Sequence, residues 1–296
     1  MDVYADIKQG EKGAWLSIVA YIALSMVKLI IGFTFFSSAL QADGWNNLTD
    51  IVASVAVLIG LKISQKPPDH DHPYGHFRAE TISALIASFI MAMVGLQVVI
   101  NTITTMFNGQ TEAPSMLTAW VALACAVVMY TVYMYNSKLA KRINNQALMA
   151  AAQDNRSDAL VSIGAAIGIF GAQLGLKWLD PLAALVVGAI ILKTAWHIFR
   201  DATYALTDGF DESQLQSLRA TIQQTNGVKT IKDVKARLHG NHVLVDVVVQ
   251  VNPNLSLIES HEICDEVERR MMKKHNIAHV QVHVEPLEME SATNSK

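Results

Sequence analysis

The sequence has few charged residues, few cysteines and no marked excess of either charge. Charged residues are 17% of 296 positions, apolar residues are 51%, and the formal net charge is −3. A chain without a basic excess gives no reason to expect a nucleic-acid partner. The two cysteines, Cys125 and Cys264, lie far apart, so a disulfide framework is excluded. The apolar excess indicates a protein of the lipid bilayer.

The amino terminus lacks the pattern of a cleaved signal peptide. It reads "MDVYADIKQGEKG", and the apolar run that follows is too long for a signal core and has no cleavage site. We expect this run to stay in the mature protein as a membrane span.

Long apolar runs fill the first two thirds of the chain. A spanning helix needs about 20 apolar residues, and six segments meet this length: 14–36, 38–64, 80–107, 115–137, 147–175 and 181–206. Six spans place both termini on one side. Basic residues gather in the even-numbered connections, at Lys66, Arg78, Lys138, Lys141 and Arg142, whereas the odd-numbered ones hold only Lys177. By the positive-inside rule, both termini are predicted to be cytoplasmic, in a multi-pass protein of the cell membrane.

The last third has the pattern of a small cytoplasmic α+β domain. Helices are expected at 211–225 and 256–275, and alternating strands at 231–238, 242–251 and 278–286. The order is αββαβ, which suits two helices on one face of a sheet. We therefore divide the chain into a membrane domain (1–208, with a His-rich loop at 67–80), a tail domain (209–290) and a disordered end (291–296).

Two predicted spans carry matched pairs of polar residues. Asn46 and Asp50 lie four apart in "NNLTDIVAS", and Asp154 and Asp158 lie four apart in "DNRSDALVS". Residues four apart share a helix face, and ionisable groups at this depth usually mark an ion or proton path. Together the pairs offer one amide oxygen and three carboxylates, a hard ligand set for a divalent cation. The alternative is that these groups only pair with Lys28, Arg156 or one another and hold helices together.

A second candidate metal site lies in the loop "PPDHDHPYGHFRAE". Asp69, His72 and His76 are spaced so that a short loop could fold them around one ion, with His70 and Asp71 as further ligands. The alternative is a solvated polar loop whose histidines bind nothing.

The tail offers weaker candidates at His261, His283 and Glu285. His283 and Glu285 are two apart on a predicted strand and so face the same side. Four other residues lie near them in sequence: His239, His242, Asp246 and His279. The string "HEICD" lacks the second histidine of a zinc-protease helix, so no protease is predicted.

Taken together, the six spans, the two polar pairs, the string "HDHPYGH" and the αββαβ tail resemble the cation diffusion facilitator family of divalent-metal efflux transporters. The resemblance implies a homodimer that exchanges cytoplasmic metal for protons by alternating access, with a ferredoxin-like, metal-responsive dimerisation tail. It implies no cofactor and no enzymatic activity.

Residue by residue, the resemblance places the transport site at Asn46, Asp50, Asp154 and Asp158, and the loop site at Asp69, His72 and His76. Zinc carriers of the family usually have a histidine in the transport site, and this sequence has none. An oxygen-only set favours Mn²⁺ and is similar to that of bacterial manganese exporters; Zn²⁺, Fe²⁺ and Co²⁺ stay open as alternatives.

The resemblance also bears on two other regions. It implies a charge interlock between Arg78 and Asp208, where the spans meet the tail. Lys232 and Val248 stand where zinc-binding relatives have histidine, which leaves only His261, His283 and Glu285 of the tail set.

Metal and protons are expected to compete for the same oxygens, because three facing carboxylates repel one another when no cation is present. An inward proton gradient would then drive metal out. Two other classes are weighed: a membrane-anchored metal sensor, which would not need acidic pairs at mid-membrane depth, and an intramembrane enzyme, for which no catalytic pattern is present.

Overall fold

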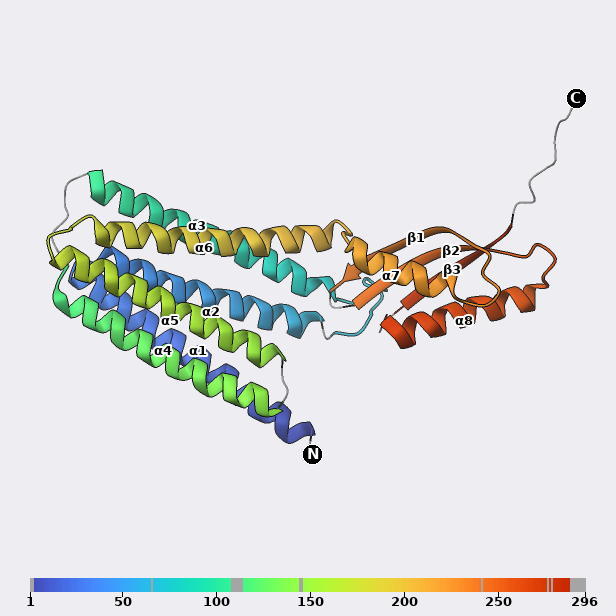
Figure 1. Cartoon of the computed structure of the whole chain (residues 1–296), viewed down its shortest axis with the longest axis horizontal. Helices are drawn as coiled ribbons and strands as arrows, with labels where there is room; N and C mark the ends of the chain where they lie inside the picture. The colour runs from blue at the N-terminus through green and yellow to red at the C-terminus, as the bar shows by residue number, and fades with distance from the viewer. Residues whose placement is uncertain are drawn as a thin grey trace, which may run out of the picture. The chain divides into compact units, whose positions relative to one another are not determined.

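The computed structural model describes residues 3–64, 66–107, 114–143, 146–240, 242–275, 277 and 279–287. The predicted disordered end at 291–296 lies outside these residues. Within them the chain forms six long helices followed by an α+β segment (Figure 1).

The six long helices follow the predicted spans closely. They are α1 (Val3–Thr34), α2 (Ser38–Ser64), α3 (Arg78–Phe107), α4 (Met116–Ile143), α5 (Gln146–Gln173) and α6 (Leu179–Leu206). Two ends differ from the prediction by more than two residues: α1 begins at Val3, and α4 continues to Ile143. Both helices therefore continue beyond their apolar runs into polar residues. Hydropathy marks only the apolar part of a helix, so it could not predict these ends.

Only some of these helices are apolar enough to be recognised as spans by composition. Among the described residues, the ranges long and apolar enough are Trp15–Thr34, Arg78–Phe107, Met116–Arg142 and Leu179–Leu206. The other two long helices, α2 and α5, are the ones that carry the polar pairs. Large apolar side chains such as Ile86, Phe89 and Trp120 are more than half exposed. Such a surface requires lipid rather than water around it.

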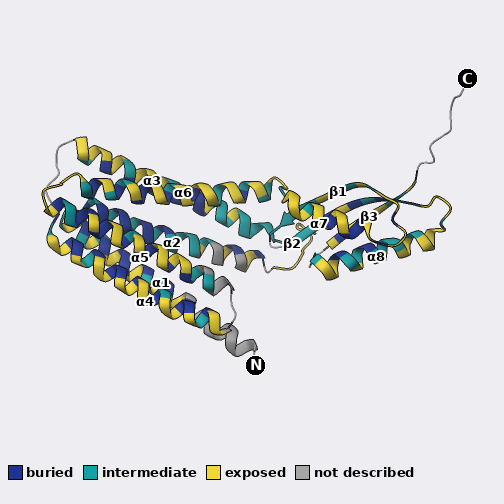
Figure 2. Cartoon of the chain, viewed as in Figure 1, coloured by how far each residue is buried: buried dark blue, intermediate teal, exposed yellow. Residues whose placement is uncertain are grey.

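Contacts divide the chain into two compact units. The first, 1–58 with 86–199, packs its long helices through small residues: Ala39, Ala119, Ala122 and Ala165 are fully buried. Small residues let helix backbones approach closely, which is how membrane helices associate without a hydrophobic driving force. Figure 2 shows buried and exposed positions alternating along these helices.

The second unit comprises 59–85 and 200–296. Its tail contains α7 (Glu212–Gln223), β1 (Thr230–His239), β2 (His242–Val251), α8 (Leu257–His275) and β3 (His279–Pro286). The sheet order is β1-β2-β3, with β1 antiparallel and β3 parallel to β2. The αββαβ order agrees with the sequence prediction.

Helices α7 and α8 pack on one face of this sheet. Alternate strand residues, including Val245, Val247 and Val249, are buried against Ile222 of α7 and Met271 of α8. Both helices begin at capping residues: Asp211 accepts from the backbone N–H of Gln214 at 3.0 Å, and Ser256 and Glu259 bond reciprocally. The opposite face of the sheet is left with the remaining, more polar set of side chains.

Candidate metal transport site

The two predicted polar pairs meet between α2 and α5. Asn46 and Asp158 are buried, and the Nδ2 of Asn46 donates to Asp158 Oδ1 at 3.0 Å and to Asp50 Oδ2 at 3.4 Å. Asp50 is half-buried. Three of the four predicted residues are thus in direct contact, although they come from helices more than a hundred residues apart in sequence.

The fourth residue, Asp154, stands slightly apart. It is exposed, and it lines the same cavity of about 740 Å³ as Asn46, Asp50 and Asp158. Within the described chain, the three carboxylates do not come as close together as the ligands of the loop site below. The site is therefore open on the side of Asp154, toward the start of α5.

Tyr21 of α1 adds a third helix to the site. Its hydroxyl donates a hydrogen bond of 2.6 Å to Asp158 Oδ2, and its side chain is buried. Both oxygens of Asp158 are therefore engaged, one by Tyr21 and one by Asn46. The sequence analysis missed Tyr21, because a tyrosine in an apolar run has no distinguishing spacing.

Helix α6 contributes two further polar residues that the sequence analysis missed. Lys193 and His197, four apart and so on one face, line the cavity beside the acidic residues. Their spacing repeats that of the two predicted pairs, which is the signal that could have identified them.

Lys28 does not neutralise the transport carboxylates directly. Its ammonium lies 2.9 Å from Asp43 Oδ1 and donates to Ser162 at 2.9 Å and to Asn47. Arg156, the other cation considered, is exposed. Neither cation is thus a direct partner of the predicted transport carboxylates in the described part of the chain. The interpretation that the acidic pairs only hold helices together through these two cations is therefore not supported.

The loop residues Asp69, His72 and His76 form a compact cluster. One ligand atom of each lies within 4.8 Å of the others, and no other such group of three occurs among the described residues. Asp69 Oδ1 accepts from the backbone N–H of His72 at 2.7 Å and lies 3.1 Å from its Nδ1, and Asp69 Oδ2 lies 3.5 Å from His76 Nε2. These separations suit three ligands around one ion with bonds of about 2.1 Å.

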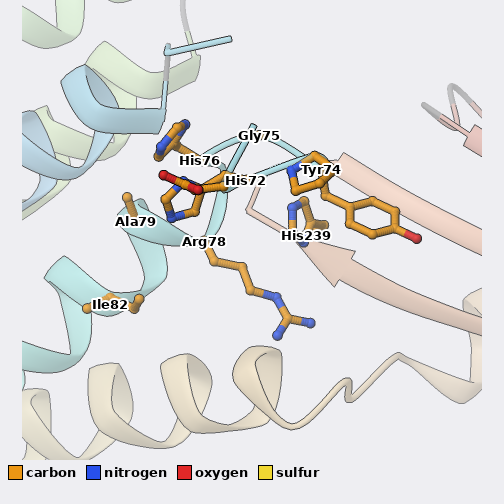
Figure 3. Close-up of a pocket in the computed structure, with 10 residues that line it drawn as sticks. His72, Tyr74, Gly75, His76, Arg78, Ala79, Ile82 and His239 are labelled. Atoms are coloured by element: carbon orange, nitrogen blue, oxygen red, sulfur yellow. The ribbon is translucent and has the colours of Figure 1, made fainter. Parts of the chain in front are cut away.

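Hydrogen bonds from His72 favour the ionised form of Asp69. The backbone N–H of His72 holds the pKa of Asp69 below its usual value, and the His72 side chain adds to this effect. The two residues considered as further ligands, His70 and Asp71, point into solvent and do not join the cluster. Figure 3 shows His72 and His76 side by side in the loop, with Arg78 directed away from them.

The predicted tail ligands do not come together within one chain. His283 and Glu285 lie on β3 and alternate with Val282 and Val284, which face the helices, whereas His261 lies on α8. Their side of the sheet is the one that α8 does not cover, so His261 cannot reach them. Glu285 instead pairs with Lys232 at 2.6 Å, and His283 is in register with Val248. A single chain thus offers no three-ligand site at these positions.

Arg78 and Asp208, the predicted interlock, are in contact in the second unit. The Arg78 guanidinium donates to Asp208 Oδ1 at 2.6 Å, and Arg237 of β1 lies 3.9 Å from Asp208 Oδ2. The Arg237 contact was not foreseen, since sequence alone does not bring β1 to the end of α6.

These features define a membrane protein with a cavity between its long helices that is lined by carboxylate and amide side chains. Residues 14–207 match the cation efflux transmembrane domain, and residues 210–287 match the cytoplasmic domain of cation efflux proteins. The chain therefore belongs to the cation efflux family, as the sequence resemblance indicates. It is a multi-pass cation efflux transporter and not an enzyme.

Three relatives are similar over nearly the full chain. The manganese efflux system protein MneS of Bacillus subtilis is 56% identical over 97% of this chain and 99% of its own. The uncharacterized transporter YdbO of the same organism is 54% identical over 97% and 99%. The manganese efflux system protein MneP, also of B. subtilis, is 31% identical over 93% and 95%.

Proposed function

We propose that this protein exports a divalent metal, manganese first of all, in exchange for protons, and that Asn46, Asp50, Asp154 and Asp158 bind the metal. The observation that carries the proposal is the contact of the Asn46 amide with both Asp50 and Asp158 in a cavity that Asp154 also lines. The names of MneS and MneP support manganese as the cargo.

The choice of metal follows from the ligand chemistry. One amide and three carboxylates offer only oxygen, which suits Mn²⁺ better than the softer Zn²⁺. Fe²⁺ and Co²⁺ tolerate the same ligands, and they are the alternative cargoes with Zn²⁺. A metal sensor remains the alternative from another class, but it would not need a cavity leading to mid-membrane carboxylates.

The Asn46 N–H group lies between two carboxylates, at the position that a cation would take. An arriving metal ion displaces this donor, and the Asn46 amide turns so that its oxygen faces the ion. Protons and metal compete for the same carboxylate oxygens. If each stabilises the state open to its own side of the membrane, the proton gradient drives the exchange.

The proposal extends to the membrane topology, the oligomeric state and the other predicted sites. Six spans, α1 to α6, place both termini in the cytoplasm of a cell-membrane protein, and the ferredoxin-like tail forms a homodimer. We keep the division into a membrane domain (1–208) and a tail domain (209–290), with Asp69, His72 and His76 as a second, loop-borne metal site and Arg78 with Asp208 as the interlock. The description of the tail family, as a cytoplasmic domain of cation efflux proteins, supports its location.

The test is a flux assay in sealed proteoliposomes that contain only this protein and carry an imposed pH gradient, with Mn²⁺, Zn²⁺, Fe²⁺ and Co²⁺ supplied in turn. We expect Mn²⁺ flux coupled to opposite proton movement. Asp50→Ala and Asp158→Ala should each abolish flux while the protein stays folded, because each removes a ligand charge and not a packing group. Near-normal flux in either variant would overturn the site assignment, and the absence of metal-coupled proton flow would overturn antiport.

A further inference from the structure

A buried ion pair lies next to the transport site but does not line its cavity. Lys28 of α1 and Asp43 of α2 are both 0% exposed, and Lys28 Nζ lies 2.9 Å from Asp43 Oδ1. Burying two charges costs more than their attraction returns unless hydrogen bonds satisfy them as well. A pair of this kind is therefore a poor device for stability alone.

Asp43 is unusually poorly satisfied. Within the described chain neither of its side-chain oxygens accepts a hydrogen bond of good geometry, although both are buried. The hydrogen bonds of Lys28 go instead to Asn47 of α2 and Ser162 of α5. A buried carboxylate with one counter-ion and no donors needs an explanation beyond packing.

The position of the Lys28–Asp43 pair relative to the transport site supplies this explanation. Asp43 and Asn47 lie about one to two turns before Asp50 on the same helix, and Ser162 lies one turn after Asp158. On α1, Lys28 likewise follows Tyr21 by two turns. Three helices thus continue from the transport site to the ion pair in one direction, toward the start of α2.

The cavity extends in the opposite direction. Besides the site residues it is lined by Ser54, Ala151 and His197, which lie toward the end of α2, the start of α5 and the end of α6. Among the residues that line it, Lys28, Asp43, Asn47 and Ser162 do not occur. The ion pair therefore lies beyond the closed end of the cavity.

We propose that Lys28 and Asp43 seal the transport path, and that the Lys28 ammonium occupies a cation position at Asp43 which the transported metal takes when the path opens to the other side. The proposal rests on the proposed function. The Lys28 ammonium holds α1, α2 and α5 together in the closed state, and its departure leaves a buried carboxylate that a metal ion or a proton must neutralise. Asp43 is thus a further cation site, after the transport site, on the way out.

The test separates sealing from simple structural support by comparing single and double neutral variants of the full-length protein. Asp43→Asn alone leaves the Lys28 ammonium buried without its counter-ion, and we expect it to lower Tm by at least about 5 °C. The double variant Lys28→Met with Asp43→Asn removes both charges, and it should recover most of this Tm. Mn²⁺ binding to the detergent-solubilised double variant should stay within about threefold of wild type, since the transport site is intact, while Mn²⁺ flux in proteoliposomes should fall at least tenfold.

Asp180 provides a matched control. It is a buried carboxylate of α6 that accepts from Ser37 at 2.7 Å and from the backbone N–H of Ser38 at 2.8 Å, at the start of α2 and away from the cavity. Asp180→Asn should lower Tm without lowering Mn²⁺ flux per folded protein. If the Lys28→Met with Asp43→Asn variant keeps wild-type Mn²⁺ flux per folded protein, whatever its Tm, the pair does not belong to the transport path and the proposal is wrong. If the wild-type protein does not bind Mn²⁺, the proposed function itself is contradicted.

Discussion

The guanidinium of Arg78, in the first turn of α3, donates a 2.6 Å hydrogen bond to the carboxylate of Asp208, directly after α6. Asp208 has a positive φ of 60°, a left-handed conformation that aspartate tolerates better than alanine. Both side chains are partly exposed, at 38% and 48%. Solvent therefore screens the pair, and Arg237 at 3.9 Å shares the same carboxylate.

We expect this contact to stabilise the folded protein by a modest amount. Because Asp208→Ala would also strain the backbone, the informative variants are Asp208→Asn and Arg78→Gln. Their coupling energy in a double-mutant cycle on Tm should be about 0.5–1 kcal/mol, the upper part of the range for exposed pairs. The exchange Arg78→Asp with Asp208→Arg should recover only part of the loss, because the new arginine would face Arg237. A coupling energy of zero would show that the Arg78–Asp208 contact does not contribute to the stability of the folded protein.

The metal preference is expected to depend on Asn46. Asn46→His places an imidazole at the same helical position, beside Asp50 and Asp158, so the ligand set becomes softer. The Mn²⁺ to Zn²⁺ flux ratio should fall at least tenfold. Asn46→Gln serves as the control, since it keeps an amide oxygen while moving it. An unchanged ratio in Asn46→His would remove the basis for the hard-ligand explanation of manganese preference.

Much of this site could be predicted because helix periodicity fixes which residues share a face. The i, i+4 spacing of Asn46 with Asp50, and of Asp154 with Asp158, was enough to define two half-sites. The loop cluster likewise follows from close sequence spacing. What periodicity does not fix is how each helix is rotated about its axis, so Tyr21, which has no polar partner four residues away, could not be placed at the cavity in advance.

The tail shows the opposite case, in which strand alternation was applied correctly but incompletely. It placed His283 and Glu285 on one face, as found. Helix α8 covers the face of the sheet that carries the buried valines of β2. His261 of α8 therefore lies on the opposite side of the sheet from His283 and Glu285. The ion pair of Lys232 with Glu285 also depends on the irregular register of β1 between Ile231 and Asp233, which no local pattern indicates.

The start of α8 should weaken on acidification. The backbone N–H and then the hydroxyl of Ser256 donate to Glu259 and hold its pKa below the usual value. A carboxylate whose pKa is lowered by folding contributes stability that is present above its unfolded pKa and is lost as pH falls through the lower folded pKa. Below about pH 4.5, hydrogen-exchange protection in the first turn of α8, corrected for intrinsic rates, should fall in wild type. In Glu259→Gln it should be lower at neutral pH and change less over the same range; equal pH profiles would contradict the capping role.

The hydrogen bond between Tyr21 and Asp158 provides the last prediction. At 2.6 Å it fixes one carboxylate oxygen, so that the other faces Asn46 and the proposed position of the metal. Tyr21→Phe removes only the hydroxyl and leaves the ring to pack. A hydrogen bond to a charged group is worth about 1.5–3 kcal/mol, and its loss lets Asp158 rotate. We therefore expect the KM for Mn²⁺ to rise roughly tenfold, with Tm reduced by only a few degrees.

Tyr130 lies on α4, is about half exposed and does not line the cavity, so Tyr130→Phe is the matched control and should leave the KM unchanged. If Tyr21→Phe transports Mn²⁺ with the wild-type KM, Tyr21 does not orient Asp158 for metal binding.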